Sequence, residues 1–81
     1  MRDLVEYLAR ALVEHPDQVQ VTQREDDDTI IIELRVASED MGKVIGKQGR
    51  IAKSIRTLVK ASAGLDERKK IAVDIMPLDE E

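Results

Sequence analysis

The feature that most constrains the fold is a four-residue interruption, Gly46-Lys47-Gln48-Gly49, between two segments whose apolar residues have helical spacing. Glycine has no Cβ, so it enters backbone conformations that end a helix and lets a bulky ligand approach the main chain. The lysine and the amino end of the second helix both favour a negatively charged ligand. The sequence therefore predicts two helices joined by a tight turn, which suits a nucleic-acid backbone better than other common ligands.

Basic residues gather around this turn, although the whole chain has a net charge of −4. Residues 41–65 contain six basic residues and no acidic one, so the other residues together carry −10. The local field decides whether phosphate binds, and acidic surfaces elsewhere help to orient a polyanion. The alternative interpretation is that the basic helix face is ordinary solvated surface. The six basic residues are Lys43, Lys47, Arg50, Lys53, Arg56 and Lys60.

The length of 81 residues allows one small domain with a single core. Because the chain has no cysteine, neither a disulfide nor a thiolate metal site is expected, which fits a reducing cytoplasm. Charges interrupt every apolar run near the amino end, so we expect a cytoplasmic protein with no signal peptide and no membrane span. With one histidine and no cysteine, no nucleophile has a base partner, so no enzymatic activity, metal, cofactor or small-molecule substrate is predicted.

Apolar periodicity predicts a helix at the start of the chain. Asp3 and Glu6 have the spacing of a capping box, with Asp3 as the N-cap. Pro16 pushes His15 out of helical geometry and is expected to end the helix. The apolar stripe of this helix, flanked by Tyr7, is predicted to contain Leu4, Leu8, Ala11 and Leu12.

Alternating apolar residues predict a hairpin after this helix. Val19 and Val21 indicate a half-exposed strand to about Arg24, and three aspartates at positions 26–28 indicate an exposed turn. The clearest strand covers positions 29–36. Ile31 breaks its alternation and is expected on the sheet face without helices, but four apolar residues recur at every second position. These residues are Ile30, Ile32, Leu34 and Val36.

The rest of the chain predicts two helices and a final strand. Ser38 is expected to cap a helix over positions 39–45, and a longer helix after Gly49 is expected to end at Gly64. The last strand is predicted over positions 69–76, closed by Pro77, within one domain of residues 1–78 and before an acidic tail at 79–81. The longer helix is predicted to turn inward Ile51, Ile55, Leu58, Val59 and Ser62.

The segment Val44-Ile45-Gly46-Lys47-Gln48-Gly49-Arg50-Ile51 resembles the GXXG core of a KH domain. The element order resembles the type II (prokaryotic) arrangement, and at this length the chain resembles the KhpA family of small bacterial KH proteins over essentially all 81 residues. Chance often supplies a lone Gly-x-x-Gly, but its position between two helices, after a hairpin and before a strand, makes the match specific. The resemblance implies an α+β fold, with three helices packed on one face of a three-stranded sheet.

The resemblance also implies a groove that accepts about four nucleotides of single-stranded RNA. By position, Gly46 and Gly49 permit close approach of the sugar-phosphate backbone, while Lys47 and Gln48 face the phosphates. The basic rim is then extended by Lys43, Arg50 and Lys53. The apolar floor is formed or supported by Val44, Ile45 and Ile51.

The family resemblance implies a non-catalytic RNA chaperone or post-transcriptional regulator. It also implies a link to cell shape and cell-wall homeostasis. It also implies a homodimer and a complex with a larger KH protein, KhpB or Jag. Joining two weak sites would raise avidity without new contacts. Tyr7 is the only aromatic residue, which excludes RNA-binding folds that depend on several stacking platforms.

Two alternatives stay open. The chain is either an RNA-binding module itself or a protein-interaction subunit whose larger partner contacts the RNA, and six uncompensated positive charges favour the first. Single-stranded DNA binding differs only in contacts to the 2′-hydroxyl, which the sequence does not distinguish.

Overall fold

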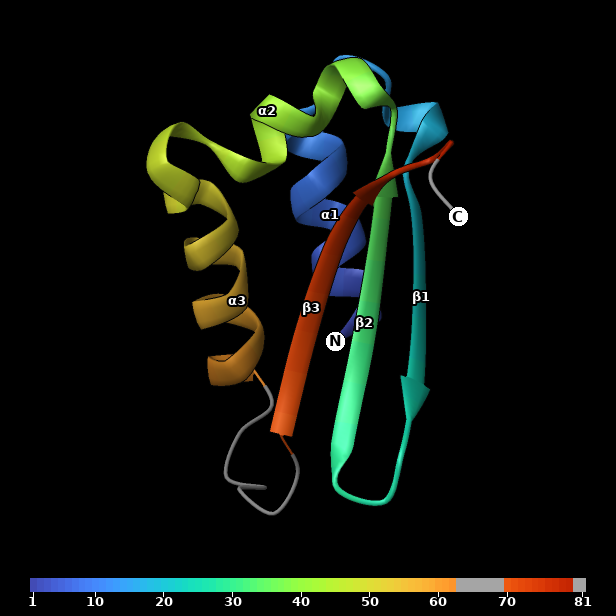
Figure 1. Cartoon of the computed structure of the whole chain (residues 1–81), viewed down its shortest axis with the longest axis vertical. Helices are drawn as coiled ribbons and strands as arrows, with labels where there is room; N and C mark the ends of the chain where they lie inside the picture. Colours follow the sequence, from blue (N-terminus) through green and yellow to red (C-terminus); the bar gives the residue numbers. More distant parts are fainter. Residues whose placement is uncertain (63–69, 80–81) are drawn as a thin grey trace.

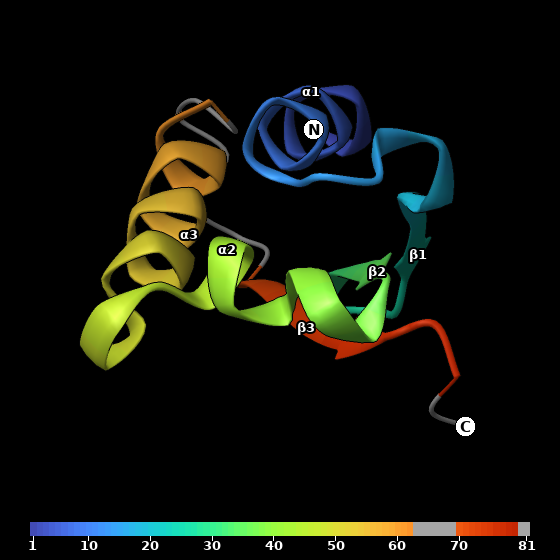
Figure 2. The ribbon, with the colours of Figure 1, turned by 90° about the horizontal axis from the view of Figure 1, so that it is seen from above.

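The computed structural model describes residues 1–62 and 70–79 of the chain. Its helices and strands are α1 (Arg2–Leu12), β1 (Gln20–Glu25), β2 (Thr29–Val36), α2 (Met41–Ile45), α3 (Arg50–Ser62) and β3 (Lys70–Pro77). The strands form a sheet of order β1-β2-β3, and the three described helices cover one of its faces (Figures 1 and 2). The predicted α+β fold and element order are confirmed. The helix stop at Gly64, a strand start at Lys69 and tail residues 80–81 lie outside the described residues.

The central strand β2 has the alternation that the sequence predicted. Ile32, Leu34 and Val36 are completely buried, whereas the residues between them are half-buried. β1 pairs with β2 antiparallel, and the amide of Asp26 donates to the carbonyl of Thr29 at 2.8 Å to close the hairpin turn. The strand prediction succeeds because the alternation leaves only one face that can enter the core.

β3 pairs with β2 in parallel and forms one edge of the sheet. The amides of Lys70 and Leu78 donate to β2-side carbonyls at 2.8 and 2.9 Å, so the even-numbered residues of β3 direct their main-chain groups toward β2. The odd-numbered residues therefore direct theirs toward the free edge. For this reason Pro77 belongs to the strand instead of closing it, because its missing N–H lies on the unpaired side.

The buried face of α1 differs from the predicted one. Val5 and Ala9 are completely buried, whereas Ala11 and Leu12 are exposed. The helix ends at Leu12, three residues before the expected end. Tyr7 does not flank a buried stripe but is 72% exposed, because it stands two positions, about 200°, from Val5 around the helix.

The predicted capping box at the start of α1 is wrong. Met1 is the N-cap residue, and no side chain caps the helix. Asp3 lies inside the helix, and the carboxylate of Glu6 binds the guanidinium groups of Arg2 and Arg10 at 2.8 and 3.1 Å. Glu6 has an arginine one turn before it and another one turn after it, and its carboxylate pairs with these instead of with the amino end of the helix.

In α3, Ile55 and Val59 are buried as predicted, and Ala52 joins them. Leu58 was predicted to point inward but is 48% exposed, and Ser62 is also exposed. The inward face of the helix is set by Ala52, Ile55 and Val59, which are three and four residues apart. Leu58 lies about 100° away from Val59 around the helix, so it points outward. The correct face is thus narrower than the apolar pattern suggests.

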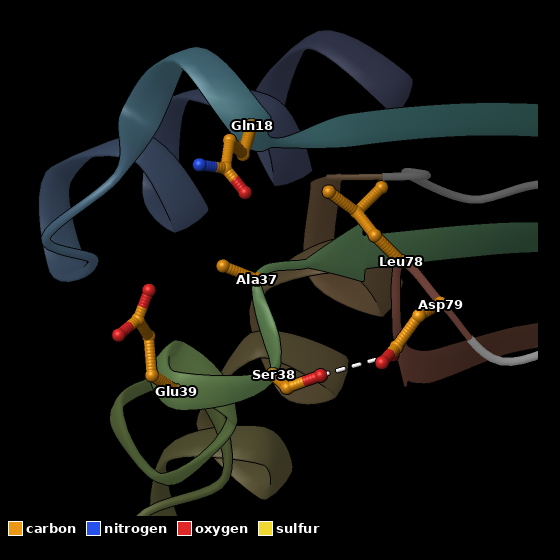
Figure 3. Close-up of a pocket in the computed structure, with 6 residues that line it drawn as sticks. All are labelled: Gln18, Ala37, Ser38, Glu39, Leu78 and Asp79. Carbon is orange, nitrogen blue, oxygen red and sulfur yellow. Dashed lines mark hydrogen bonds between the residues drawn. The ribbon is translucent and has the colours of Figure 1, made fainter.

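The start of α2 is fixed by a residue that the sequence did not single out. Ser38 does not cap the helix; its hydroxyl donates to the carboxylate of Asp79 at 2.9 Å (Figure 3). Asp40 is completely buried, and its two carboxylate oxygens accept the amides of Glu14 and His15 at 3.1 Å each. This buried carboxylate joins the segment after α1 to the amino end of α2.

Candidate nucleic-acid interface

The turn between α2 and α3 has an unusual backbone. Gly46 has φ 77° and ψ 173°, a region that only glycine adopts readily. Gln48 and Gly49 also have positive φ angles, 57° and 74°, so the chain reverses its curvature before α3 begins. The amide of Gly49 donates to the carbonyl of Gly46 at 3.1 Å, which closes a single turn. The predicted interruption of the two helices is therefore present.

The two glycines have different roles. A Cβ atom at Gly46 would lie 2.6 Å from Cγ1 of Ile51, so the missing side chain here makes room for the packing of α3 against the turn. A Cβ atom at Gly49 would meet nothing within 4 Å. Gly49 therefore leaves open space that a ligand can enter, whereas the space at Gly46 is already filled by the protein.

The polar side chains of the turn point into solvent. Lys47 and Gln48 are both exposed, and the amide oxygen of Gln48 accepts a hydrogen bond from Nη2 of Arg50 at 3.3 Å. Lys47 forms no ion pair within residues 1–62 and 70–79. Lys47 and Gln48, which the sequence assigned to the phosphates, therefore lie around Gly49 together with Arg50 of the predicted basic rim.

One flank of α3 continues this basic surface. Lys53, Arg56 and Lys60 are spaced by three and four residues, so they lie along one side of the helix, and Lys53 stands one turn after Gly49. In the described part of the chain neither lysine has an acidic partner. Arg56 differs, because its guanidinium donates to the carbonyl of Val73 in β3. The basic spacing was visible in the sequence, but the contact with β3 was not.

Lys43 differs from the other basic residues of this surface, because its ammonium has an acidic partner. Its ammonium lies 3.5 Å from the carboxylate of Glu14, in the segment after α1. An exposed ion pair of this kind is weak, but it reduces the positive charge that Lys43 offers to a ligand. Lys43 is therefore the least available of the predicted basic rim residues.

The predicted apolar floor divides into two parts. Val44 is completely buried in the core and can only support a ligand site. Ile45 and Ile51 are half-buried beside the turn and pack against that core. Ile51 also fills the space beside Gly46, so it holds the turn in place while part of its surface faces outward.

A pocket of about 400 Å³ lies away from the turn and has a different character (Figure 3). It is lined by Gln18, Ala37, Ser38, Glu39, Leu78 and Asp79. Its two carboxylates would repel a polyanion, so it does not belong to the basic surface. Among the described residues no group of three acidic, histidine or cysteine side chains could hold a metal ion, and no described helix is long and apolar enough to cross a membrane.

The α-β-β-α-α-β order, the mixed sheet and the GXXG turn between α2 and α3 together define a type II KH domain. A family model described as "KhpA/KhpB, KH domain" matches residues 2–75. The chain therefore belongs to the KhpA/KhpB KH-domain family.

Curated relatives agree over nearly the whole chain. The "RNA-binding protein KhpA" of Caldanaerobacter subterraneus subsp. tengcongensis is 59% identical over 94% of this chain and 100% of its own length. The protein of the same name from Clostridium acetobutylicum is 55% identical with the same coverage. The family prediction made from the sequence is confirmed.

Solved structures support the fold. Era from Aquifex aeolicus bound to GDP and aluminium fluoride matches 95% of this chain with a TM-score of 0.65 and 22% identity. A complex of Era with MgGDPNP and nucleotides 1506–1542 of 16S ribosomal RNA matches 94% with a TM-score of 0.62 and 22% identity. The chain spans about three tenths of each Era chain, 30% and 29%. At this identity the likeness concerns the fold alone.

Proposed function

We propose that this chain binds single-stranded RNA without catalysis and holds the sugar-phosphate backbone at the turn of residues 46–49. The observation that carries the proposal is the open space at Gly49, beside a helix flank with uncompensated positive charge. A backbone can approach the main chain only where no Cβ stands in the way. The lysines along the flank then neutralise phosphates and release counterions.

The residues of the proposed site have different roles. Gly49 admits the backbone, Lys47 and Gln48 contact phosphates, and Lys53 extends the contact along α3. Gly46 acts indirectly, because it lets Ile51 pack beneath the turn. The remaining members of the proposed site are Lys43, Arg50, Val44 and Ile45.

A role as an RNA chaperone or post-transcriptional regulator, with links to cell shape and cell-wall homeostasis, is part of this proposal. The names of the curated relatives support RNA binding. We also propose a homodimer and a complex with a larger KH protein of the KhpB or Jag type. Leu58, exposed beside a cleft of about 450 Å³ on α3, supports a protein contact on the outer side of that helix.

The decisive experiment replaces both polar residues of the turn, Lys47→Asp with Gln48→Asp, and titrates labelled single-stranded RNA at several salt concentrations. Loss of RNA binding is expected, while the fold is kept because aspartate tolerates the positive φ at position 48. The control is Gln20→Asp with Arg24→Asp on β1, which changes the net charge equally at exposed positions. Circular dichroism and thermal unfolding verify both variants. RNA binding by the turn variant at the parent's strength would refute the proposal.

The same titration separates the second candidate, a protein-interaction subunit that leaves RNA to its partner. That function predicts no measurable RNA binding by the isolated chain, and a loss of association with itself or the partner when Leu58 is changed to aspartate. DNA of the same sequence, run in parallel, measures the contribution of the 2′-hydroxyl groups.

A further inference from the structure

Arg56 is held differently from the other basic side chains of α3. Its Nε and Nη2 atoms both donate to the main-chain carbonyl of Val73, at 3.2 and 3.1 Å. Both donors lie on one side of the planar guanidinium and share one acceptor. This arrangement fixes the plane of the group as well as its position. Arg56 is therefore an oriented donor, whereas Lys53 and Lys60 on the same flank are mobile point charges.

The acceptor lies on the free edge of the sheet. Val73 is an odd-numbered residue of β3, so its carbonyl points away from β2 and has no partner in the ladder. The side chain of Arg56 thus reaches from α3 to the edge of β3. In Figure 1 these two elements lie side by side below α2, which leads into the turn. The guanidinium consequently lies between α3 and the outer edge of β3.

Among residues 1–62 and 70–79, these two bonds are the only ones that Arg56 makes, so three of its five guanidinium N–H donors have no partner there. Both terminal nitrogens still carry a free N–H, so the group presents a fork of donors and has no acceptor of its own. Such a fork fits a ligand edge with two adjacent acceptors. In RNA this means two oxygens of a phosphate, N7 and O6 of guanine, or N3 and O2 of cytosine. Adenine and uracil alternate donors with acceptors along their edges and do not offer such a pair.

The position of Arg56 favours a base over a phosphate. In the proposed function the sugar-phosphate backbone lies at the turn, and Arg56 is seven residues beyond Gly49, about 10 Å along the helix axis. Bases extend away from the backbone that carries them, and the bonds to Val73 hold the guanidinium of Arg56 against β3, away from the turn. Resting on the proposed function, we infer that Arg56 determines specificity by binding a guanine or cytosine base, while Lys53 contacts phosphate.

The test compares Arg56→Lys with Lys53→Gln. Arg56→Lys keeps the charge but removes the fork. Each protein is titrated by fluorescence anisotropy with an oligo(U) that carries one central G, C or A, and with oligo(U) itself, at four salt concentrations. Arg24→Gln on β1 is the control for a lost charge at a distant exposed site. Thermal unfolding verifies that each variant is folded.

The expected result is that Arg56→Lys weakens binding to the G or C oligomer by about tenfold and leaves binding to the A and U oligomers unchanged. Its salt slope should equal that of the parent. Lys53→Gln should weaken all four oligomers equally and lower the salt slope by about 0.7. An equal loss for all four oligomers in Arg56→Lys, or no loss at all, would overturn the inference and leave Arg56 as a link between α3 and β3.

A second measurement does not depend on a variant that folds. The Nε–H resonance of Arg56 in the parent protein should shift on addition of the G or C oligomer and not with oligo(U). A resonance shift of the same size with the G or C oligomer and with oligo(U) would refute the proposal that Arg56 binds a base. If the parent binds none of the oligomers, the proposed function itself fails; if it binds them all equally through Lys47 and Gln48, only the role of Arg56 is refuted.

Discussion

α1 and α3 cover the same face of the sheet, but the charged side chains on their outer surfaces are arranged in opposite ways. In α1 the carboxylate of Glu6 binds Arg2 and Arg10, so the helix neutralises its own surface. α3 contains no acidic residue at all. Like charges three and four residues apart repel each other, so α3 keeps an arrangement that costs stability in the free protein. The difference is that the charges of α1 stabilise the helix, whereas the positive charge of α3 stays available for the RNA contact that we propose.

The two helices also begin differently. α1 starts after Met1 without a side-chain cap, whereas α3 follows a turn with three positive φ angles. Strained backbone persists only where the surrounding structure supports it. Here the support is the packing of Ile51 into the space at Gly46, which sets where α3 presents its charges.

The largest effect is expected at Gly46, and it tests whether α3, unlike α1, depends on this turn. Gly46→Ala places a methyl group against Ile51 and forces alanine into a glycine backbone region. The loss in the free energy of unfolding should be about 3 kcal/mol or more. Gly49→Ala should lower the free energy of unfolding by only about 1 kcal/mol. Its new Cβ meets no atom within 4 Å, so the loss comes from the positive φ of the backbone alone. Urea titration followed by circular dichroism measures both, and equal losses would contradict the distinction between the glycines.

An intermediate effect is expected when α3 is given the charge pattern of α1. In Lys53→Glu the new carboxylate has Arg50 three residues before it and Arg56 three residues after it, as Glu6 lies between two arginines. The helix should gain a few tenths of a kcal/mol, and RNA affinity should fall by about tenfold or more at physiological salt. Anisotropy titration and thermal unfolding give the two numbers. Unchanged affinity would show that the free charge of α3 has no part in binding.

The smallest effect is expected from breaking the neutral pattern of α1. Glu6→Gln removes both ion pairs and should lower the free energy of unfolding by about 0.5 kcal/mol. RNA affinity should stay unchanged, because α1 lies outside the proposed site. Asp3→Asn is the matched control, since the Asp3 side chain is 96% exposed and its ion pair within the described part of the chain is with Arg2 alone. A loss of affinity in Glu6→Gln would break the contrast between the helices.

The sequence predicts best where a single pattern has a single physical solution. In the strand over positions 29–36 every second residue from Ile30 to Val36 is apolar, and the GXXG turn lies between two helices, so both predictions were correct. α1 is harder, because Leu4, Val5, Leu8 and Ala9 allow more than one inward direction. Packing against β1 and α3 decides between them, and no local pattern contains that information.

The candidate site was predictable in composition but not in detail. The sequence identified the glycines and the basic residues, yet it treated both glycines alike and Arg56 as one more rim charge. The difference between Gly46 and Gly49 depends on where Ile51 lies relative to the turn, and the contact of Arg56 depends on which residues of β3 direct their carbonyls to the edge of the sheet. Both are relations between distant parts of the chain. The buried carboxylate of Asp40 was missed for the same reason.

The hydrogen bonds that the amides of Glu14 and His15 donate to Asp40 have a practical consequence. They tie together the two ends of the segment that contains the whole β1–β2 hairpin. The tip of that hairpin, residues 26–28, is exposed and lies at the end of the molecule opposite α2 (Figure 1). A peptide tag or a fluorophore inserted at this tip should therefore be tolerated and leave the proposed RNA site undisturbed, which makes it a suitable place for a reporter.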